Sequence, residues 1–458
     1  MTDGSASHAA PTVVVVGGGF SGLLTAIHLL DNDRQVIVRL LEKSETFGGG
    51  RAYGSANGQH LLNVRASNMS AFPDRPDHFL DWLQARDGTG DGFVRRGVYG
   101  EYLQALLRGA LGEGGHPGRL LLERDEAVAL DLNGTRPSVR LALGRSLTAD
   151  AVVLATGLGL PAAAPGAACE GIGAPAYFAD PWSLDPATAP AGDILLIGSG
   201  LTMVDVASQL DRPDRRFTVV SRHGLLPRSH GPAAVAPLPD GPLTTPRETL
   251  RSLRAHAAVV GWRSAVDSLR PLTPAIWRGW SLAERRRFLR HGRAWWDVHR
   301  HRMAPRIAER MQRLADEGRL SVLAARLESL EPAAEGLVAR LRRRGLRSAE
   351  TRTFAAAVNC TGLSADILGA PLLRDLAGQG RLRPDPLKLG IDVDDAFRVR
   401  DTDGAPVAGL YAVGPLVRGA RWESVAVPDL RKQTAEIAAT LLADLRAERQ
   451  ARRPVTPC

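Results

Sequence analysis

The feature that most constrains this chain is a glycine-rich turn between a strand-like and a helix-like segment near its start. Val13–Val16 is an unbroken β-branched run, and Gly-Gly-Gly-Phe-Ser-Gly follows it at residues 17–22. A helical apolar pattern comes next, and a second apolar run, Val36–Leu41, ends in Glu42. This order of strand, glycine turn, helix, strand and acid is typical of a dinucleotide-binding fold.

Each residue of the pattern has a physical role in that fold. Gly17 makes the tight turn, Gly19 lets the backbone approach a pyrophosphate, and Gly22 lets the helix pack close to the strand. The helix N-terminus directs free N–H groups and a partial positive charge at the phosphates. Glu42 is placed to accept both ribose hydroxyls, with Lys43 beside it.

Length and charge narrow the class of protein. The 458 residues are enough for two or three domains. The net charge is +9, but Lys43, Lys388 and Lys432 are the only lysines among 58 basic residues. Such an arginine bias favours genome composition over a nucleic-acid surface, so no nucleic-acid partner is expected.

Neither a membrane nor a metal partner is expected. No uncharged apolar stretch is long enough to span a bilayer. The first eleven residues lack the basic-then-apolar order of a signal peptide, so a cytoplasmic location is expected. Cys169, Cys360 and Cys458 are far apart and form no C-x-x-C pair, which predicts neither a disulfide framework nor a metal site.

Two similar strand endings predict a nested domain organisation. Ala151–Leu154 is followed by Ala-Thr-Gly157, and Ala356–Val358 is followed by Asn-Cys-Thr-Gly362. Such endings mark the crossings between domains in flavoproteins with two dinucleotide folds. The fold class predicted is α/β, with two nested Rossmann-like domains. The outer domain is expected at 1–165 and 355–458, and the inserted domain at 166–354.

The inserted region opens with a second dinucleotide pattern. A strand-like run at 193–197 leads into Gly198 and Gly200, with Met203 where the third glycine would be. The next strand ends in Arg222 instead of an acid, and an arginine there can pair with a 2′-phosphate. This favours NADPH over NADH, although Arg222 could also be an ordinary solvated side chain.

A helical insertion is expected at about 245–318. It holds five of the eight tryptophans: Trp262, Trp277, Trp280, Trp295 and Trp296. We expect these side chains to pack on the nucleotide domain; a wall of the substrate pocket is the alternative. His299 and His301 are two residues apart, which is the wrong spacing for a metal pair on a helix.

Other candidate cofactor residues lie outside the two glycine turns. Arg51, after a second glycine cluster, could meet a phosphate, or the cluster could be a flexible loop. Asn63 could offer its amide to the edge of a flavin ring, or could cap a turn. Gly157 and Gly414 end buried strands of the outer domain, and the strand that ends at Gly414 leads toward the last helix.

Two nested dinucleotide folds indicate FAD on the outer domain and NADPH (or NADH) on the inner one, with the flavin carrying the redox chemistry. A thiol–disulfide reductase needs a cysteine pair, and none is present. We therefore predict oxygen activation through a C4a-hydroperoxyflavin, with O₂ and a small-molecule substrate. A reductase or dehydrogenase without oxygen insertion, or a redox sensor, is the alternative. No catalytic side chain is assigned; Arg228 or His230 could anchor an anionic substrate.

Several segments together resemble a known bacterial family. They are residues 15–22, Glu42, 60–73, 198–205, 221–230 and 423–431, of which Leu-Leu-Asn-Val…Met-Ser-Ala-Phe-Pro and Arg-His-Gly-Leu-Leu-Pro are the most specific. The family of FAD/NAD(P)-binding proteins that they resemble includes the flavin-dependent urate hydroxylase and the nitrosuccinate-forming aspartate N-monooxygenase. Ornithine and lysine N-hydroxylases are more remotely similar. The resemblance implies hydroxylation of a small polar, often nitrogenous, substrate.

Overall fold

Buried parallel strands followed by helices build two separate units of the chain. The computed structural model describes residues 10–54, 60–159, 161–164, 166, 176–238, 241–364 and 366–451. The first unit comprises the described residues of 1–58, 65–159 and 366–458, and the second those of 59–64 and 160–365. The chain therefore enters the second unit twice, briefly at residues 60–64 and then for the long segment that ends before residue 366.

The first unit contains a six-stranded sheet in the order β15-β16-β7-β1-β2-β3. All its neighbouring strands are parallel except β15 and β16. Its strands are β1 (Thr12–Val16), β2 (Ile37–Glu42), β3 (Leu120–Arg124), β7 (Ala151–Leu154), β15 (Arg398–Arg400) and β16 (Pro406–Ala412). A small antiparallel sheet is made by β4 (Ala127–Asp131), β5 (Ser138–Leu141) and β6 (Ser146–Thr148).

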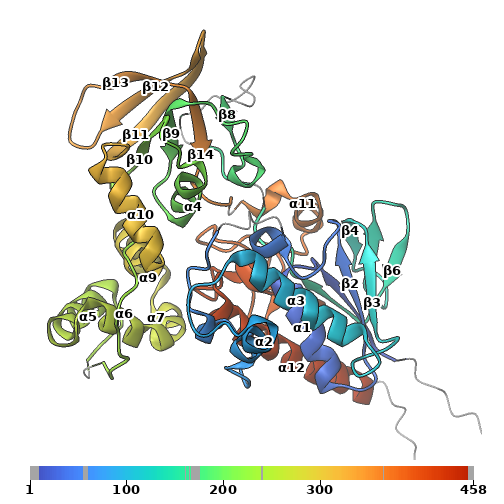
Figure 1. The fold of residues 1–458 in the computed structure, drawn as a ribbon. Helices are drawn as coiled ribbons and strands as arrows, with labels where there is room; N and C mark the ends of the chain where they lie inside the picture. Colours follow the sequence, from blue (N-terminus) through green and yellow to red (C-terminus); the bar gives the residue numbers. More distant parts are fainter. Residues whose placement is uncertain are drawn as a thin grey trace, which may run out of the picture. The chain divides into compact units, whose positions relative to one another are not determined.

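The helices of the first unit bury apolar side chains against this sheet and against one another. Val13, Val14 and Val15 of β1 are fully buried, as expected for a central parallel strand covered on both faces. The last helix, drawn in red in Figure 1, packs against α1. The helices are α1 (Phe20–Asn32), α2 (His78–Asp87), α3 (Arg96–Leu111), α11 (Pro371–Gly378) and α12 (Val427–Ala451).

The second unit contains a seven-stranded sheet in the order β13-β12-β11-β10-β9-β14-β8. Strands β11, β10, β9, β14 and β8 run parallel, as in the first unit. The bounds are β8 (Tyr177–Phe178), β9 (Gly192–Ile197), β10 (Arg215–Ser221), β11 (Leu320–Ala333), β12 (Gly336–Arg343), β13 (Glu350–Phe354) and β14 (Ala356–Asn359).

Strand β11 is part of both the parallel sheet and an antiparallel ribbon. Its first half, Leu320 to Ala324, pairs in parallel with β10, and its second half, from Ala325 on, pairs antiparallel with β12. Figure 1 shows β11, β12 and β13 (orange) extending from the parallel strands as a twisted antiparallel ribbon. The ribbon therefore starts directly beside the end of β10.

The helices of the second unit include the expected helical segment. They are α4 (Leu201–Leu210), α5 (Pro246–Val260), α6 (Trp262–Leu269), α7 (Thr273–Gly279), α8 (Leu282–His291), α9 (Arg293–Arg300) and α10 (Pro305–Asp316). We call α5 to α10 the helical insertion. Within the described ranges, we find no helix with the length and apolar character that a bilayer crossing requires.

Several tryptophans of the helical insertion contact aromatic rings within the insertion itself. Trp277 and Trp280 are buried against each other, with ring centroids 6.3 Å apart, and both meet Phe288 of α8. Trp262 contacts His299 within the same insertion, and Trp295 is half exposed. These contacts give the insertion an aromatic core of its own, a use of tryptophan that sequence alone does not distinguish from packing on the nucleotide domain.

The predicted fold class is confirmed: the chain is α/β, with two Rossmann-like units and a helical insertion. The division into units differs from the sequence-based boundaries at the described residues 60–64, 161–164 and 355–364, which group with the second unit. For the later segment the reason is strand pairing, because β14 pairs with β9 and β8. The assignment of each unit to a cofactor stays a prediction.

The closest approach in the first unit is between α1 and the turn before it. A Cβ atom on Gly22 would lie 1.8 Å from the carbonyl oxygen of Gly17, which is far inside van der Waals contact. Gly109, an exposed glycine in α3, has open space around the same position. The two glycines therefore form a matched pair for testing the approach.

We expect Gly22→Ala to lower the free energy of unfolding by about 1–3 kcal/mol or more, because the backbone must move to admit the methyl group. Gly109→Ala should raise it by up to about 1 kcal/mol, because alanine is the better helix former. Chemical denaturation of both variants measures the difference. Equal effects of the two substitutions would contradict the close-approach argument.

Candidate functional site

The first glycine turn has the backbone geometry of a phosphate-binding loop. Gly17 has φ +107°, a conformation open to glycine, and its amide donates to the carbonyl of Leu41 at 2.8 Å. A Cβ on Gly17 would lie 2.5 Å from the carbonyl oxygen of Ala155. The turn is therefore held between β2 and the end of β7, and no other residue fits its first position.

The N-terminus of α1 is left open to an anion. Gly19 is the capping residue, so no side chain accepts a hydrogen bond from the first turn, and that turn holds no acidic residue. The first N–H groups of a helix have no partner within it and carry a partial positive charge. Together with the space left by Gly19, this makes the N-terminus a candidate pyrophosphate site.

Glu42 lies at the end of β2, next to this loop. Its Oε2 accepts from the amide of Gly18 at 2.8 Å, and its Oε1 accepts from the amide of Ser44 at 2.9 Å. These two bonds fix the carboxylate beside the glycine turn, where ribose hydroxyls would be received. Lys43 instead points to the surface, and its Nζ is 3.1 Å from Oε1 of Glu126.

The second glycine cluster packs directly on the first. The amide of Gly48 donates to the carbonyl of Gly18, and the Cα of Gly50 lies 3.5 Å from the position of a Cβ on Gly19. Gly50 begins the π-helical turn Gly50–Gly54, which contains the half-buried Arg51. Arg51 thus lies on the segment that adjoins the candidate phosphate loop.

Two further predicted cofactor residues belong to the same unit. Gly414 has φ +80°, and a Cβ there would lie 2.7 Å from Oγ of Ser21 at the start of α1. Gly157, just beyond the end of β7, has φ +68° and open space around it. The first unit therefore brings Gly414 to the same helix N-terminus as the glycine turn, while Gly157 follows the neighbouring strand.

Asn63 groups with the second unit and not with the first glycine turn. Nε2 of His230 donates to the backbone carbonyl of Asn63 at 3.0 Å. The structure thus brings together Asn63 and one of the two residues considered as substrate anchors, a pairing that sequence reasoning missed. The other anchor candidate, Arg228, is exposed.

The second glycine turn repeats the geometry of the first. Gly198 has φ +106°, its amide donates to the carbonyl of Val220 at 2.8 Å, and a Cβ on it would lie 2.6 Å from the carbonyl of Cys360. Gly200 caps α4 without a side-chain hydrogen bond. Met203 occupies the position of the third glycine and is fully buried in the core of the second unit.

The two turns differ at the end of the second strand of each fold. Ser221 occupies the position of Glu42, and its Oγ accepts from Oγ of Ser199 at 2.9 Å and from the amide of Gly224 at 3.0 Å. Arg222 follows and is exposed. The second turn thus presents a hydroxyl and a guanidinium group where the first presents a carboxylate.

Arg222 lines a strongly basic cavity of about 600 Å³, which we call the arginine cavity. Its lining residues are Arg222, His223, Arg290, His291, Ala325, Arg326, Arg342, Arg343, Arg344, Gly345, Leu346 and Arg347. The run Arg342-Arg343-Arg344 is visible in the sequence, but no sequence signal places it beside Arg222, because the contact depends on the pairing of β10, β11 and β12.

The charges of the arginine cavity are only partly balanced. Arg342 pairs with Glu328 at 2.9 Å and Arg343 pairs with Glu350 at 3.0 Å. Within the part of the chain that the structure describes, no ion pair engages the other five arginines of the cavity: Arg222, Arg290, Arg326, Arg344 and Arg347. Burial, and the positive charges of Arg344 and Arg222, lower the pKa of His223 below its ordinary value.

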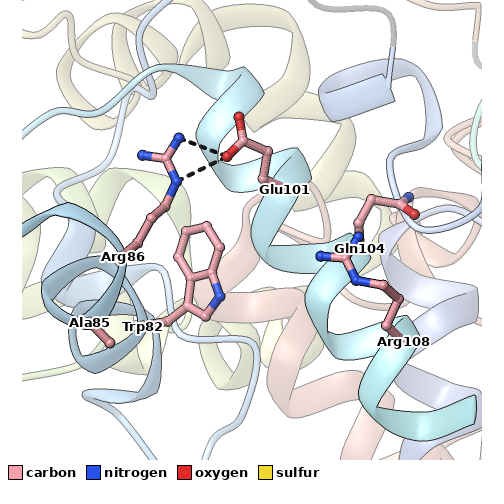
Figure 2. A pocket seen from close by; sticks show the side chains of 6 residues that line it. All are labelled: Trp82, Ala85, Arg86, Glu101, Gln104 and Arg108. Atoms are coloured by element: carbon pink, nitrogen blue, oxygen red, sulfur yellow. Dashed lines mark hydrogen bonds and ion pairs between the residues drawn. The ribbon is translucent and has the colours of Figure 1, made fainter. Parts of the chain in front are cut away.

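A second cavity, of about 470 Å³, lies in the first unit between α2 and α3. Figure 2 shows Arg86 bound to Glu101, with Trp82 below the pair and Gln104 and Arg108 on the neighbouring helix. The Arg86–Glu101 distance is 2.8 Å, so these charges already neutralise each other. This cavity offers an apolar wall of Trp82 but no group poised for chemistry.

Thiol and metal chemistry find no support among the described residues. No group of three or more histidines, cysteines, aspartates or glutamates there could hold a metal ion. Cys360 is buried, and burial raises the pKa of its thiol well above the ordinary range. Cys169 and Cys458 lie outside the described residues.

Comparison with known sequences supports the nucleotide-binding assignment of the first unit. Residues 14–159 match the profile of a family described as FAD-NAD(P)-binding. The chain is also 28% identical over 214 residues to YdhS of Escherichia coli (strain K12), an uncharacterised protein. That match covers 43% of this chain and only 38% of YdhS. The prediction of an FAD/NAD(P)-binding domain is thus confirmed for the start of the chain.

Comparison with solved structures shows the fold of the whole chain. The L-lysine 6-monooxygenase of Pseudomonas syringae superposes with a TM-score of 0.65 at 17% identity, covering 96% of this chain and 100% of that one. The ornithine hydroxylase PvdA of Pseudomonas aeruginosa gives 0.63 at 17% identity, covering 95% and 99%. The thioredoxin reductase of Lactococcus lactis gives 0.56 at 13% identity, covering 95% and 99%. The chain therefore shares the fold of these proteins over nearly its whole length.

We expect Glu42→Ala to weaken FAD binding about tenfold or more, because hydrogen bonds to a charged group contribute about 1.5–3 kcal/mol. Glu42→Gln keeps one acceptor oxygen and should have an intermediate effect. The dissociation constant is measured by titrating the flavin-free protein with FAD and following flavin fluorescence.

Glu45→Ala is the matched control, because Glu45 is three residues away, exposed, and paired with Arg124 at 2.9 Å. It should leave the dissociation constant for FAD unchanged. If Glu42→Ala and Glu45→Ala bind FAD equally well, Glu42 is not the ribose ligand.

Proposed function

We propose that this protein is an FAD-dependent monooxygenase that consumes NADPH and hydroxylates a small polar substrate. The observation that carries the proposal is the pair of glycine turns with the same backbone geometry and different chemistry at the ribose position. Glu42 follows the first turn, and Ser221 with Arg222 follows the second. A fold that binds two different dinucleotides fits an enzyme that passes electrons from one to the other.

The first unit fits FAD. Gly17 and Gly22 leave no room for a Cβ, Gly19 keeps the turn free of a side chain, and the α1 N-terminus beside it carries no competing side chain. Glu42 would hold the adenosine ribose, with Arg51 and Gly414 on segments that adjoin the same helix. When bound there, FAD supplies the electron transfer and the reaction with oxygen.

Lys43, Gly157 and Asn63 complete the proposed flavin residues. Lys43 follows the ribose acid but is engaged at the surface with Glu126, so its contribution would be electrostatic. Gly157 leaves open space at the end of β7. Asn63 groups with the second unit and contacts His230 through its backbone carbonyl, so a role for its side-chain amide at the flavin edge stays a prediction from the sequence.

The second unit fits NADPH better than NADH. Gly198 and Gly200 would hold the pyrophosphate at the N-terminus of α4, whose first turn has no acidic residue. Ser221 places no carboxylate against a 2′-phosphate, and Arg222 offers a guanidinium fork that can bind it in bidentate fashion. The positive charge around Arg222 supports this preference.

Oxygen insertion is favoured over disulfide reduction by the cysteine chemistry. A disulfide reductase requires a reactive thiolate, and burial keeps Cys360 in its thiol form. The whole-chain similarity to lysine and ornithine hydroxylases, compared with the lower TM-score of a thioredoxin reductase, supports the same choice. The resemblance to the family of urate hydroxylase and aspartate N-monooxygenase points to a nitrogenous substrate.

The exposed Arg228 is the proposed anchor for a substrate carboxylate, since Nε2 of His230 is already engaged with the carbonyl of Asn63. A guanidinium group can orient an amino acid or a urate-like anion without taking part in proton transfer. We assign no general base on this chain.

Anaerobic stopped-flow tests the proposed function. The purified protein is reduced with NADPH, mixed with O₂, and followed in the near-ultraviolet and at the flavin band. A transient absorbance that precedes the return of oxidised flavin, lengthened or consumed by a nitrogenous substrate, is the expected result. Immediate return of oxidised flavin under all substrates, with no hydroxylated product, would identify a reductase; absence of bound flavin would overturn the proposal altogether.

We expect Arg222→Ala to raise KM for NADPH by about tenfold or more while leaving KM for NADH unchanged, because only NADPH carries the 2′-phosphate. Arg216→Ala on the same strand, an exposed arginine outside the arginine cavity, is the control and should change neither. Steady-state oxidation of both nicotinamides measures the two constants. An unchanged NADPH to NADH preference would remove the assignment of Arg222.

A further inference from the structure

The arginine cavity brings together segments that are far apart in the sequence. Arg222 comes from the end of β10, Arg344 from the turn after β12, and Arg290 from the last turn of α8 in the helical insertion. We propose that Arg290 and Arg344 bind the 2′-phosphate of NADPH together with Arg222, so that the helical insertion forms one wall of the nicotinamide nucleotide site. This inference rests on the proposed function and names residues for it beyond the dinucleotide motif.

The positive charge of the cavity favours the binding of an anion. Seven arginines and two histidines line it, and no acidic residue does so in the described part of the chain. A group of like charges that line one cavity attracts a counter-ion, although the exposure of the arginines to solvent screens their mutual repulsion. A phosphate monoester carries about −1.5 to −2 charges at pH 7 and offers three acceptor oxygens, enough for several guanidinium forks.

Arg222 and Arg344 lie close together because the backbone at or next to each of them pairs with Ala324 of β11. Ser221 pairs with Ala324, and a Cβ on Gly224 would lie 2.9 Å from the amide nitrogen of Ala324. The amide of Arg344 donates to the carbonyl of Ala324 at 2.7 Å. The backbone on both sides of the cavity is thus anchored at one point of the sheet.

The side chain of His223, which also lines the cavity, is close enough to Arg222 and Arg344 to be affected by both of their charges. Its Nδ1 is shielded from solvent and has no hydrogen-bond partner among the described residues. The charges of Arg344 and Arg222 both reach this imidazole and lower its pKa. A phosphate bound in the cavity would offset the two positive charges that act on this imidazole.

The position of Arg290 depends on the aromatic core of the insertion. Phe288, two residues before it on α8, packs against Trp277 and Trp280. Oγ of Ser281 accepts from the amide of Glu284 at the start of the helix, and Glu284 pairs with Arg287. Arg290 is left without an acidic partner in the described residues and faces the cavity from the C-terminal turn.

The place of the cavity in the fold identifies the group that it receives. It begins at Arg222, the second residue after Val220, whose carbonyl accepts from Gly198 in the phosphate loop. In a dinucleotide fold the adenosine ribose lies at this strand end. The anion in the cavity is therefore a substituent of that ribose, which in NADPH is the 2′-phosphate.

The test uses the full-length protein and three single variants. Arg290→Ala and Arg344→Ala remove the proposed ligands, and Arg340→Ala is the matched control. Arg340 lies on β12, pairs with Glu328 at 3.0 Å and does not line the cavity. Calorimetric titration with adenosine 2′,5′-bisphosphate and with 5′-AMP separates the 2′-phosphate from the rest of the nucleotide.

Arg290→Ala and Arg344→Ala should each weaken binding of the bisphosphate about tenfold and leave that of 5′-AMP unchanged. Arg340→Ala should alter neither. KM for NADPH should rise in the same two variants, while KM for NADH stays constant. Retained flavin absorbance and an unchanged thermal midpoint show that the variants are folded.

Three results would overturn the inference: a wild-type protein that binds the bisphosphate no better than 5′-AMP, cavity variants that behave like wild type, or an equal loss in Arg340→Ala. The two proposals fail separately. If NADH and NADPH reduce the flavin but the cavity variants bind the bisphosphate normally, only this inference fails. If neither nicotinamide reduces the flavin, the proposed function fails, and the titration still decides the role of the cavity.

Discussion

The close approach between Gly22 and the carbonyl of Gly17 is the constraint on which the first unit depends. It allows α1 to begin directly against β1, and it aims the helix N-terminus at the space beside Gly19. Ala155, at the end of β7, closes the other side of the turn. This turn is a candidate phosphate site because backbone segments approach one another here at positions that only glycine can occupy.

The glycine turn of the second unit has the same backbone geometry as that of the first, although Met203 replaces the third glycine of the motif. Met203 is buried in the core where Gly22 makes a backbone contact in the first unit, so the tight turn requires a glycine at Gly198 but not at the helix position. What distinguishes the two units chemically is the end of the second strand. A carboxylate there suits ribose hydroxyls, whereas a hydroxyl followed by arginine suits a phosphorylated ribose.

Local patterns were sufficient to predict the strands, turns and helices around each glycine turn, because those elements follow from short-range periodicity and backbone sterics. Contacts set by strand order were not predictable. The arginine cavity needs β11 to pair with β10 in one half and with β12 in the other, and neither pairing leaves a signal near Arg222. The grouping of Asn63 with His230, and the self-packing of Trp277 and Trp280, likewise depend on tertiary structure.

The nested order of the two units has a consequence for synthesis on the ribosome. Strand β7 pairs on one side with β1 and on the other with β16, which is made only after the whole second unit. Helix α12, which packs against α1, is made after β16. The inserted unit is almost continuous in sequence and can therefore fold during translation. Until β16 is made, one edge of β7 in the outer sheet stays unpaired. The sheet of the outer unit can therefore be completed only after the inserted unit has been made.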